Sequence, residues 1–378
     1  MNDITTRYYA SRRPEPTLAD FLERWHIDWL LLTLLLIVSA LGLVVLYSAS
    51  GNSLPQVISQ AERLALGFVI MAAIAQAPPG WFRAVAPWLF GGTVLLLALT
   101  LVLGDAAKGA KRWLDFGVLR FQPSEMMKLA MPMTIAAFLH ICRLPPRLIS
   151  IVTALLLVGL PTALVVMQPD LGTALLIITS GVFALFFAGL QWRWIIGALL
   201  ALAAAAPAVW TKMHDYQRKR VLTFLDPESD PLGAGYHITQ SKIAIGSGGL
   251  FGKGWLNGTQ AKLEFLPEAH TDFIFAVYSE ELGLLGILLL LSLYLAIVVR
   301  CLWIALRAQD TFQRLLASSL AMTFFIYIFI NMGMVIGLMP VVGVPLPLVS
   351  YGGTSAVTLL ASFGMLMSIQ THRKLLAN

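Results

Sequence analysis

The sequence carries little charge for its length. Only 12% of its 378 residues are Asp, Glu, Lys or Arg, whereas 58% are hydrophobic. Soluble domains carry about 25% charged residues, because their surfaces must face water. A chain with about half that share cannot cover a water-facing surface. A soluble globular fold is therefore excluded, and much of the surface is expected to face lipid.

Cysteine is also scarce, and no cleavable signal peptide is evident. The two cysteines, Cys142 and Cys301, are too few and too far apart for a disulfide framework. Residues 1–26 are polar and of mixed charge. The apolar run at 29–48 is longer than the core of a signal peptide, and it is long enough to cross about 30 Å of hydrocarbon.

Ten apolar segments follow one another along the chain. A backbone inside lipid must satisfy its own hydrogen bonds, so each segment is expected to be a helix. The predicted fold class is an all-α polytopic membrane protein with about ten transmembrane helices and one long extracytoplasmic loop. The segments span residues 28–48, 62–77, 85–103, 124–142, 147–167, 171–189, 193–210, 273–299, 312–338 and 353–371.

Arginine and lysine in the short loops predict the orientation. They gather on one side, which should be cytoplasmic, with tails at 1–27 and 372–378 flanking one transmembrane domain at 28–371. The loops 104–123 and 211–272 on the other side are also basic. Topology does not require cations there, so they point to an anionic partner, either a specific ligand or lipid headgroups.

Asp272 lies where the loop 211–272 meets the helix predicted at 273–299. One interpretation is an N-cap, because Asp commonly caps helices. The other is a general base at the membrane surface, with His270, Glu264 and Glu268 close by in the sequence. The two interpretations are compatible, because a capping carboxylate is held in a fixed direction.

Several further charges fall within or beside apolar segments. Glu280 and Glu281 lie roughly 12 Å into the helix that follows Asp272, where carboxylates are paired or contact substrate. Glu125 and Lys128 are three residues apart, so they share a helix face and can neutralise each other. Asp170 is expected either to cap the helix at 171–189 or to orient a basic group.

Two segments have an unusual content of glycine and proline. The run Gly246–Gly254 resembles a phosphate-binding loop but fails its pattern, because Ser247 and Gly254 stand where Gly and Ser or Thr are needed. It is expected to form turns that fold the loop back. The segment Pro340–Thr354 holds three prolines and three glycines, so it cannot be a continuous helix. It is expected to form the wall of a cavity.

Five motifs, in order and between correctly spaced helices, resemble the SEDS family (shape, elongation, division, sporulation), specifically its RodA-type members. The family's catalytic Asp corresponds to Asp272, an acidic position to Glu264, and a basic position to Lys111. The motifs are Lys111–Asp115 with Phe121–Glu125, Gln168–Gly172, Tyr216–Ser241, Leu263–Glu281 and Pro345–Gly353.

The resemblance implies a peptidoglycan glycosyltransferase that polymerises lipid II into glycan strands for cell-wall elongation and rod shape. It places the protein in the bacterial inner membrane with its active site on the periplasmic side. Asp272 would act as general base. Cationic side chains or a divalent ion, Mg²⁺ or Mn²⁺, would stabilise the diphosphate as it leaves. The substrate-binding candidates are Lys111, Arg112, Glu125, Arg218, Arg220, Glu264, His270 and Ser350.

The resemblance also implies partners. These are a class B penicillin-binding protein, which is a transpeptidase, and membrane proteins of the elongation complex; no nucleic acid is expected. Two other functions stay open at this stage. A flippase of the same lipid would need cations distributed through the membrane depth, whereas here they lie at the two surfaces. A non-catalytic scaffold of a cell-wall synthase complex would leave Asp272 replaceable.

Overall fold

The structure, a computed structural model, describes residues 25–107, 110–115, 120–213, 215–226, 230, 233–263, 265–266 and 268–373. Most of both predicted tails lies outside this part. All ten predicted apolar segments are helices. They are α3 (Trp29–Ala49), α4 (Leu54–Ala75), α5 (Pro79–Leu103), α6 (Pro123–Ile141), α7 (Leu148–Met167), α8 (Leu171–Phe187), α9 (Trp192–Lys212), α13 (Ile274–Leu306), α14 (Thr311–Ile336) and α15 (Gly353–Thr371).

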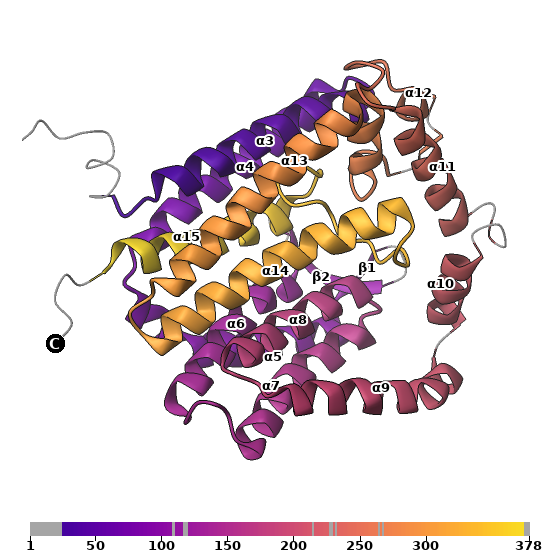
Figure 1. Cartoon of the computed structure of the whole chain (residues 1–378). Coiled ribbons are helices and arrows are strands. Elements are labelled where there is room, and N and C mark those ends of the chain that lie inside the picture. Colours follow the sequence, from indigo (N-terminus) through magenta and orange to yellow (C-terminus); the bar gives the residue numbers. More distant parts are fainter. Residues whose placement is uncertain are drawn as a thin grey trace, which may run out of the picture.

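Seven of these helices are long and apolar enough to cross a membrane, and α8 and most of α9 form shorter apolar helices. The all-α polytopic fold is thereby confirmed. α14 is the central helix of the bundle, with 72% of its apolar window buried, and it packs against α6, α8 and α13. α9 lies apart along one side, with nearly all of its described side chains exposed (Figure 1). Its apolar surface is suited to lipid rather than to the protein core.

Three predicted boundaries differ from the structure by six residues or more. α5 begins at Pro79 instead of 85. α4 begins at Leu54, eight residues before the predicted start at 62, because Pro55 occupies the first turn, where a missing N–H costs nothing. The extra turns carry the buried side chain of Gln60. α13 continues to Leu306 instead of ending at 299.

The two loops predicted to be extracytoplasmic contain regular structure that hydropathy does not predict. The loop 104–123 holds a three-stranded antiparallel sheet in the order β1 (Asp105–Ala107), β2 (Ala110–Asp115) and β3 (Arg120–Phe121). The loop 211–272 holds the helices α10 (Asp215–Leu225), α11 (Ala234–Ser247) and α12 (Thr259–Lys262). These helices and the sheet gather at one end of the bundle, on the right in Figure 1, and the start of α3 and the end of α15 lie at the other.

The glycine-rich segment 248–254 packs its backbone into a kink of α13. The kink is at Gly283, whose φ of 63° and ψ of −162° are not helical. The amides of Lys253 and Gly254 donate to the carbonyl oxygens of Glu280 and Glu281 at 3.0 and 2.9 Å, and Leu284 N donates to the carbonyl oxygen of Gly249 at 2.9 Å. The expected folding back of this loop is thus confirmed, but it forms a fitted backbone contact rather than free turns.

We expect Gly252→Ala to lower the free energy of unfolding by about 2 kcal/mol, because φ is +78° there and a Cβ would collide with the Glu281 carbonyl oxygen. The matched control is Gly246→Ala, because nothing lies within 4 Å of that Cβ and the site is helical. Thermal unfolding in detergent followed by size-exclusion chromatography measures both. Equal midpoints for the two variants would contradict the fitted contact.

Candidate active site

Asp272 stands immediately before α13 but does not cap it. The N-cap position is Phe273, and it makes no side-chain capping bond. The N-cap interpretation of Asp272 is therefore wrong. Instead, the Asp272 carboxylate faces the broken segment: its Oδ2 lies 3.5 Å from the point where a Cβ on Gly343 would stand. The Asp272 side chain is half-buried.

Four hydrogen bonds join the main chain around Asp272 to the broken segment Pro340–Thr354. Asn331 Nδ2 donates to the carbonyl oxygens of Asp272 and Val344 at 2.9 and 2.7 Å. Ser350 Oγ donates to the Thr271 carbonyl oxygen at 2.6 Å. Tyr351 N donates to the His270 carbonyl oxygen at 2.9 Å. The segment is therefore a wall of this site, and Asn331, which is fully buried in α14, joins both sides.

Gln60 supports the broken segment from behind. Its side chain is 1% exposed. Its Nε2 donates to the Ser350 carbonyl oxygen at 3.3 Å, and its Oε1 accepts from Gly352 N at 3.1 Å. The buried amide side chain thus supplies hydrogen-bond partners to main-chain groups that have no helical hydrogen bonds of their own. The role of Gln60 was not predicted from the sequence, because Gln60 lies outside the predicted span 62–77 and a single Gln has no distinguishing sequence pattern.

The predicted substrate ligand Ser350 uses its hydroxyl inside the protein. Besides donating to Thr271, its Oγ accepts from Leu346 N at 2.8 Å, and the residue is 4% exposed. We expect Ser350→Ala to lower stability by about 1–2 kcal/mol and the turnover number by about tenfold or more, because Asp272 loses its support. Ser362→Ala is the control, since that hydroxyl bonds within its own helix. Thermal unfolding and steady-state rates measure both; unchanged rates would contradict the supporting role.

His270 and an unpredicted arginine flank Tyr351. The His270 and Tyr351 rings meet edge to face with centroids 5.9 Å apart, and the Arg63 guanidinium carbon lies 4.9 Å from the centroid of the Tyr351 ring. Arg63 comes from α4, one turn after Gln60 and inside the predicted span 62–77. The predicted pair Asp272 and His270 is therefore brought together with Ser350, and a cation stands beside them.

His237 of α11 stacks on Phe273, with ring centroids 5.5 Å apart and planes at 23°. Burial lowers the pKa of His237, although the nearby carboxylates Glu268 and Asp230 act to raise it. Its Nδ1 is buried without a hydrogen-bond partner. The neutral imidazole is therefore the form that the folded protein favours.

This shift predicts a pH dependence. The folded-state pKa of His237 lies below the unfolded value of about 6.5. Its contribution to stability is therefore present above about pH 6.5 and is lost as the pH falls through the folded-state pKa. Between about pH 7.5 and 5.5 we expect His237→Gln to lose less thermal stability than the unmodified chain. Parallel unfolding curves at both pH values measure this; equal losses would refute it.

The predicted basic ligands are placed on separate elements. Arg112 in β2 donates to the carbonyl oxygens of Gln168 (3.1 Å) and Pro169, and its Nη1 lies 3.9 Å from Asp170 Oδ2. Arg218 donates to the carbonyl oxygens of Trp210 and Thr211 at 3.0 and 2.7 Å, and so closes the end of α9. These two arginines thus use some of their N–H donors in hydrogen bonds to main-chain carbonyl oxygens.

The other predicted ligands differ in how well the structure places them. Arg220 lies half-buried in α10, which packs chiefly on α11. Lys111 belongs to β2, opposite Ala106, but its side chain lies outside the described atoms, as does all of Glu264. Glu125 pairs with Lys128 at 2.5 Å, as its spacing predicted, and also accepts from Thr358 Oγ1 at 2.9 Å. It is 5% exposed, so its charge is balanced within the protein.

Asp170 confirms both of its predicted roles. Its Oδ1 caps α8 by accepting from Thr173 N at 3.2 Å. Its Oδ2 accepts from Gln122 Nε2 at 3.3 Å and faces Arg112. The turn before α8 is thereby joined to β2 and to the start of α6.

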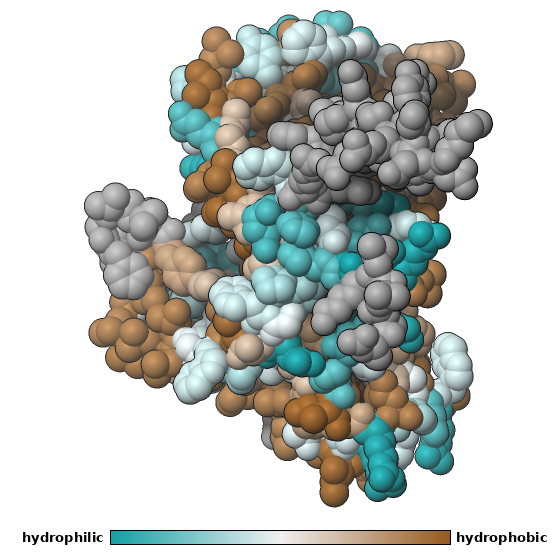
Figure 2. All heavy atoms as spheres, turned by 90° about the vertical axis from the view of Figure 1, so that its left-hand side faces the viewer, coloured by the Kyte–Doolittle hydropathy of each residue, from teal (hydrophilic) through white to brown (hydrophobic). Residues whose placement is uncertain are grey.

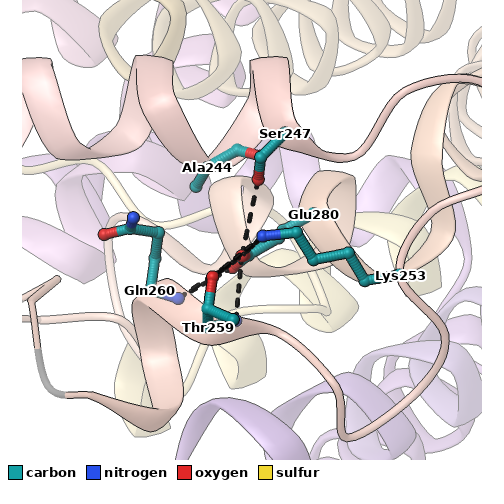
Figure 3. Close-up of polar contacts among 6 residues, drawn as sticks. All are labelled: Ala244, Ser247, Lys253, Thr259, Gln260 and Glu280. Carbon is teal, nitrogen blue, oxygen red and sulfur yellow. Dashed lines mark hydrogen bonds and ion pairs between the residues drawn. The ribbon is translucent and has the colours of Figure 1, made fainter.

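Glu280 anchors the loop 211–272 rather than standing open to a ligand. Figure 3 shows side chains and main-chain amides converging on its carboxylate. Lys253 Nζ donates at 2.6 Å, Thr259 Oγ1 and N at 2.7 and 2.8 Å, and Gln260 N at 3.1 Å. Glu281 accepts from Ser48 Oγ of α3. Pairing, one of the two predicted roles for these carboxylates, is what the structure shows for Glu280, whose partner is Lys253.

A cavity of about 1000 Å³ opens beside His270, between the turn joining α3 to α4 and the chain at 256–270. Its polar walls offer amides, one ammonium group, one carboxylate and an imidazole, which are the groups that bind sugar hydroxyls and acyl amides. The polar lining residues are Asn52, Gln56, Asn257, Lys262, Glu268 and His270.

Among the described residues, no group of three or more His, Cys, Asp or Glu side chains could hold a metal ion. Mg²⁺ is commonly held by one or two carboxylates together with substrate phosphates, rather than by an all-protein cage. Mg²⁺ or Mn²⁺ at this site therefore stays a prediction, with Asp272 as a carboxylate that faces the broken segment.

Comparison with known proteins adds a family to this geometry. The family model described as "Cell cycle protein", covering FtsW, RodA and SpoVE, matches residues 28–375. The chain is 53% identical over 363 residues to the peptidoglycan glycosyltransferase MrdB of Escherichia coli (strain K12), covering 96% of this chain and 98% of that protein.

Two solved structures resemble the fold. One belongs to a peptidoglycan synthase complex, with a TM-score of 0.82 and 34% identity over 92% of this chain and 99% of that chain. The other is the Thermus thermophilus rod shape determining protein RodA, with a TM-score of 0.70 and 30% identity over 92% of this chain and 98% of that chain. The chain therefore belongs to the FtsW/RodA/SpoVE family and is of the RodA type.

Proposed function

We propose that this chain polymerises lipid II on the periplasmic face of the inner membrane, with Asp272 as the general base. The chain is a multi-pass membrane protein and a peptidoglycan glycosyltransferase, as its 53% identity to such an enzyme shows. The proposal concerns its substrate, its catalytic residue and its orientation. It rests chiefly on Asp272, whose carboxylate caps no helix. Asn331 donates to the carbonyl oxygen of Asp272, and Ser350 donates to that of the preceding residue, Thr271.

The chemistry assigns one step to this carboxylate. A sugar hydroxyl of the acceptor gives its proton to Asp272, and its oxygen forms the new glycosidic bond at the anomeric carbon of the donor. The bond from that carbon to the diphosphate breaks, and the diphosphate leaves with the electron pair. A base fixed by packing and hydrogen bonds needs little reorganisation to take this proton.

The leaving diphosphate requires cations. Arg63 lies beside Tyr351 at the site, and Lys111 and Arg112 lie on β2, which packs against the outer ends of α5 and α6. Guanidinium groups suit phosphate oxygens, because they can donate two parallel hydrogen bonds. We assign Lys111, Arg112, Arg218, Arg220 and Glu264 to this substrate-binding region as predictions.

The remaining parts of a lipid-linked substrate also fit the fold. The cavity beside His270 offers polar groups for a disaccharide-peptide, and the exposed apolar helix α9 borders the lipid in which a polyprenyl tail would stay. Short-loop arginines place both termini in the cytoplasm. A class B penicillin-binding protein is the partner we propose, because one structural relative belongs to a peptidoglycan synthase complex.

The test uses the purified full-length protein in detergent with fluorescent lipid II, alone and with the transpeptidase added. Glycan ladders on a denaturing gel are the expected product. A folded protein that yields no ladder under either condition, but moves the labelled lipid between leaflets of vesicles, would replace polymerisation with transport. A folded protein that does neither, yet retains the transpeptidase on a column, would be a scaffold.

A further inference from the structure

The ends of α3, α13 and α15 meet around one indole ring, that of Trp303. Arg300, Trp303 and Arg307 share a face of α13, because they are three and four residues apart. Arg373 follows the end of α15. The guanidinium carbons of Arg300, Arg307 and Arg373 lie 4.3, 3.8 and 5.8 Å from the centroid of the Trp303 ring. Three positive charges therefore crowd around a single aromatic side chain.

One carboxylate neutralises one of these charges. Asp28 is 4% exposed and accepts from Arg300 Nε at 3.1 Å and Nη2 at 2.5 Å. Its other oxygen caps α3 by accepting from Leu31 N at 2.9 Å. Asp28 is thus fully engaged. Within the described part of the chain, Arg307 and Arg373 have no carboxylate within ion-pair distance.

Arg373 shows that this arrangement is incomplete. Its Nη2 donates to Gln370 Oε1 at 2.5 Å, but its Nε is buried without any hydrogen-bond partner. Burial lowers the pKa of Arg373, and the neighbouring charges of Arg307 and Arg300 lower it further. The nearby ends of α13 and α15 contribute about half a negative charge each, which is spread over main-chain carbonyl groups and does not supply an acceptor for that Nε.

The site lies at the membrane-surface end of the bundle that is remote from Asp272. Asp272 precedes the first residue of α13, whereas Arg307 follows its last, so roughly 50 Å of helix separates them. Figure 2 shows this end, where hydrophilic residues gather in the middle between apolar regions. Leu306 and Val299 on α13 are 78% and 56% exposed, and they provide apolar contact next to the cations.

We propose that Arg307, Arg373 and the Trp303 ring bind the phosphate group of an anionic phospholipid. A phosphate diester offers several acceptor oxygens to two guanidinium groups. Tryptophan side chains favour the depth of the headgroups, and basic pockets between transmembrane helices bind such headgroups. The exposed leucine and valine side chains favour a lipid over free phosphate, because they can contact its acyl chains.

Native mass spectrometry of the full-length protein in detergent, titrated with dioleoyl phosphatidylglycerol, measures the binding. We expect the double variant Arg307→Gln/Arg373→Gln to bind the lipid about tenfold more weakly than the unmodified chain. Phosphatidylcholine should bind equally weakly to both proteins. Arg193→Gln is the matched control, because Arg193 also stands over a tryptophan, Trp194, at 5.4 Å, but no second arginine of the described residues lies over that ring. It should bind phosphatidylglycerol like the unmodified chain.

Three outcomes would overturn the proposal. One is equal affinity of the unmodified chain for the two lipids. Another is an equal loss in Arg193→Gln, which would indicate a general effect of surface charge. The third is binding of inorganic phosphate that excludes the lipid, which would assign the site to a free anion. The variant Arg307→Lys/Arg373→Lys keeps the charge and loses the planar fork, so an intermediate affinity is expected, and its unfolding temperature checks that the fold is intact.

Discussion

Replacing Asp272 by asparagine is expected to lower the turnover number for glycan polymerisation by about 10²–10⁴-fold. Asparagine keeps the size of the side chain. It also leaves in place the hydrogen bonds that Asn331 Nδ2 and Tyr351 N donate to the main chain at residues 272 and 270. It cannot take a proton from a sugar hydroxyl. The loss should therefore fall on the turnover number rather than on the apparent affinity for lipid II, because the substrate's contacts remain.

Glu62→Gln is the control for this variant. Glu62 is an exposed carboxylate on α4, the helix that also carries Gln60 and Arg63. If general negative charge near the site were sufficient, both variants would lose activity alike. Initial rates of polymerisation, with binding of labelled lipid II measured separately, distinguish the two cases. A rate for Asp272→Asn within tenfold of the unmodified protein would remove the general-base assignment.

Replacing Glu280 by alanine is expected to lower the free energy of unfolding by about 3 kcal/mol. The carboxylate is fully buried, whereas the Lys253 side chain is 29% exposed. Lys253 can therefore turn to water, but the main-chain amides of Thr259 and Gln260 lose their acceptor. We expect the segment 248–260 to detach locally before the bundle unfolds, because little else at this surface neutralises those donors.

Hydrogen–deuterium exchange of peptides covering 248–260 measures this detachment, and thermal unfolding measures the global cost. Glu62→Gln, a change at an exposed carboxylate on α4, should leave both unchanged. The double variant Glu280→Leu/Lys253→Met should regain part of the stability, because a buried ion pair can be replaced by apolar groups at small cost. Unaltered exchange in Glu280→Ala would show that the loop is held by the glycine contacts alone.

The two carboxylates connect α13 to different parts of the site. Asp272 precedes the helix and faces the broken segment. Glu280 and the kink at Gly283, two and three turns further on, hold the loop 211–272. The cavity beside His270 is bounded by this same loop. A change at Glu280 is therefore expected to alter the shape of the cavity as well as stability.

The sequence alone determined the helices, because a lipid-exposed chain must be apolar for about 20 residues at a time and must form its own hydrogen bonds. It also indicated that Pro340–Thr354 is a broken wall, since proline and glycine interrupt a helix whatever surrounds them. The spacing of Glu125 and Lys128 predicted their pairing for an equally local reason. The family resemblance placed the catalytic role on Asp272.

Only the tertiary structure showed which side chains hold that wall in place. Gln60, Asn331 and Ser350 act through hydrogen bonds to main-chain atoms as far as 292, 59 and 79 residues away, and nothing in the local sequence distinguishes them. The same holds for the Gly252 contact with α13, and for the arginines that converge on Trp303 from separate helices. Hydropathy depends on composition within one segment, whereas these contacts depend on how distant segments are brought together, so they appear only once the chain is folded.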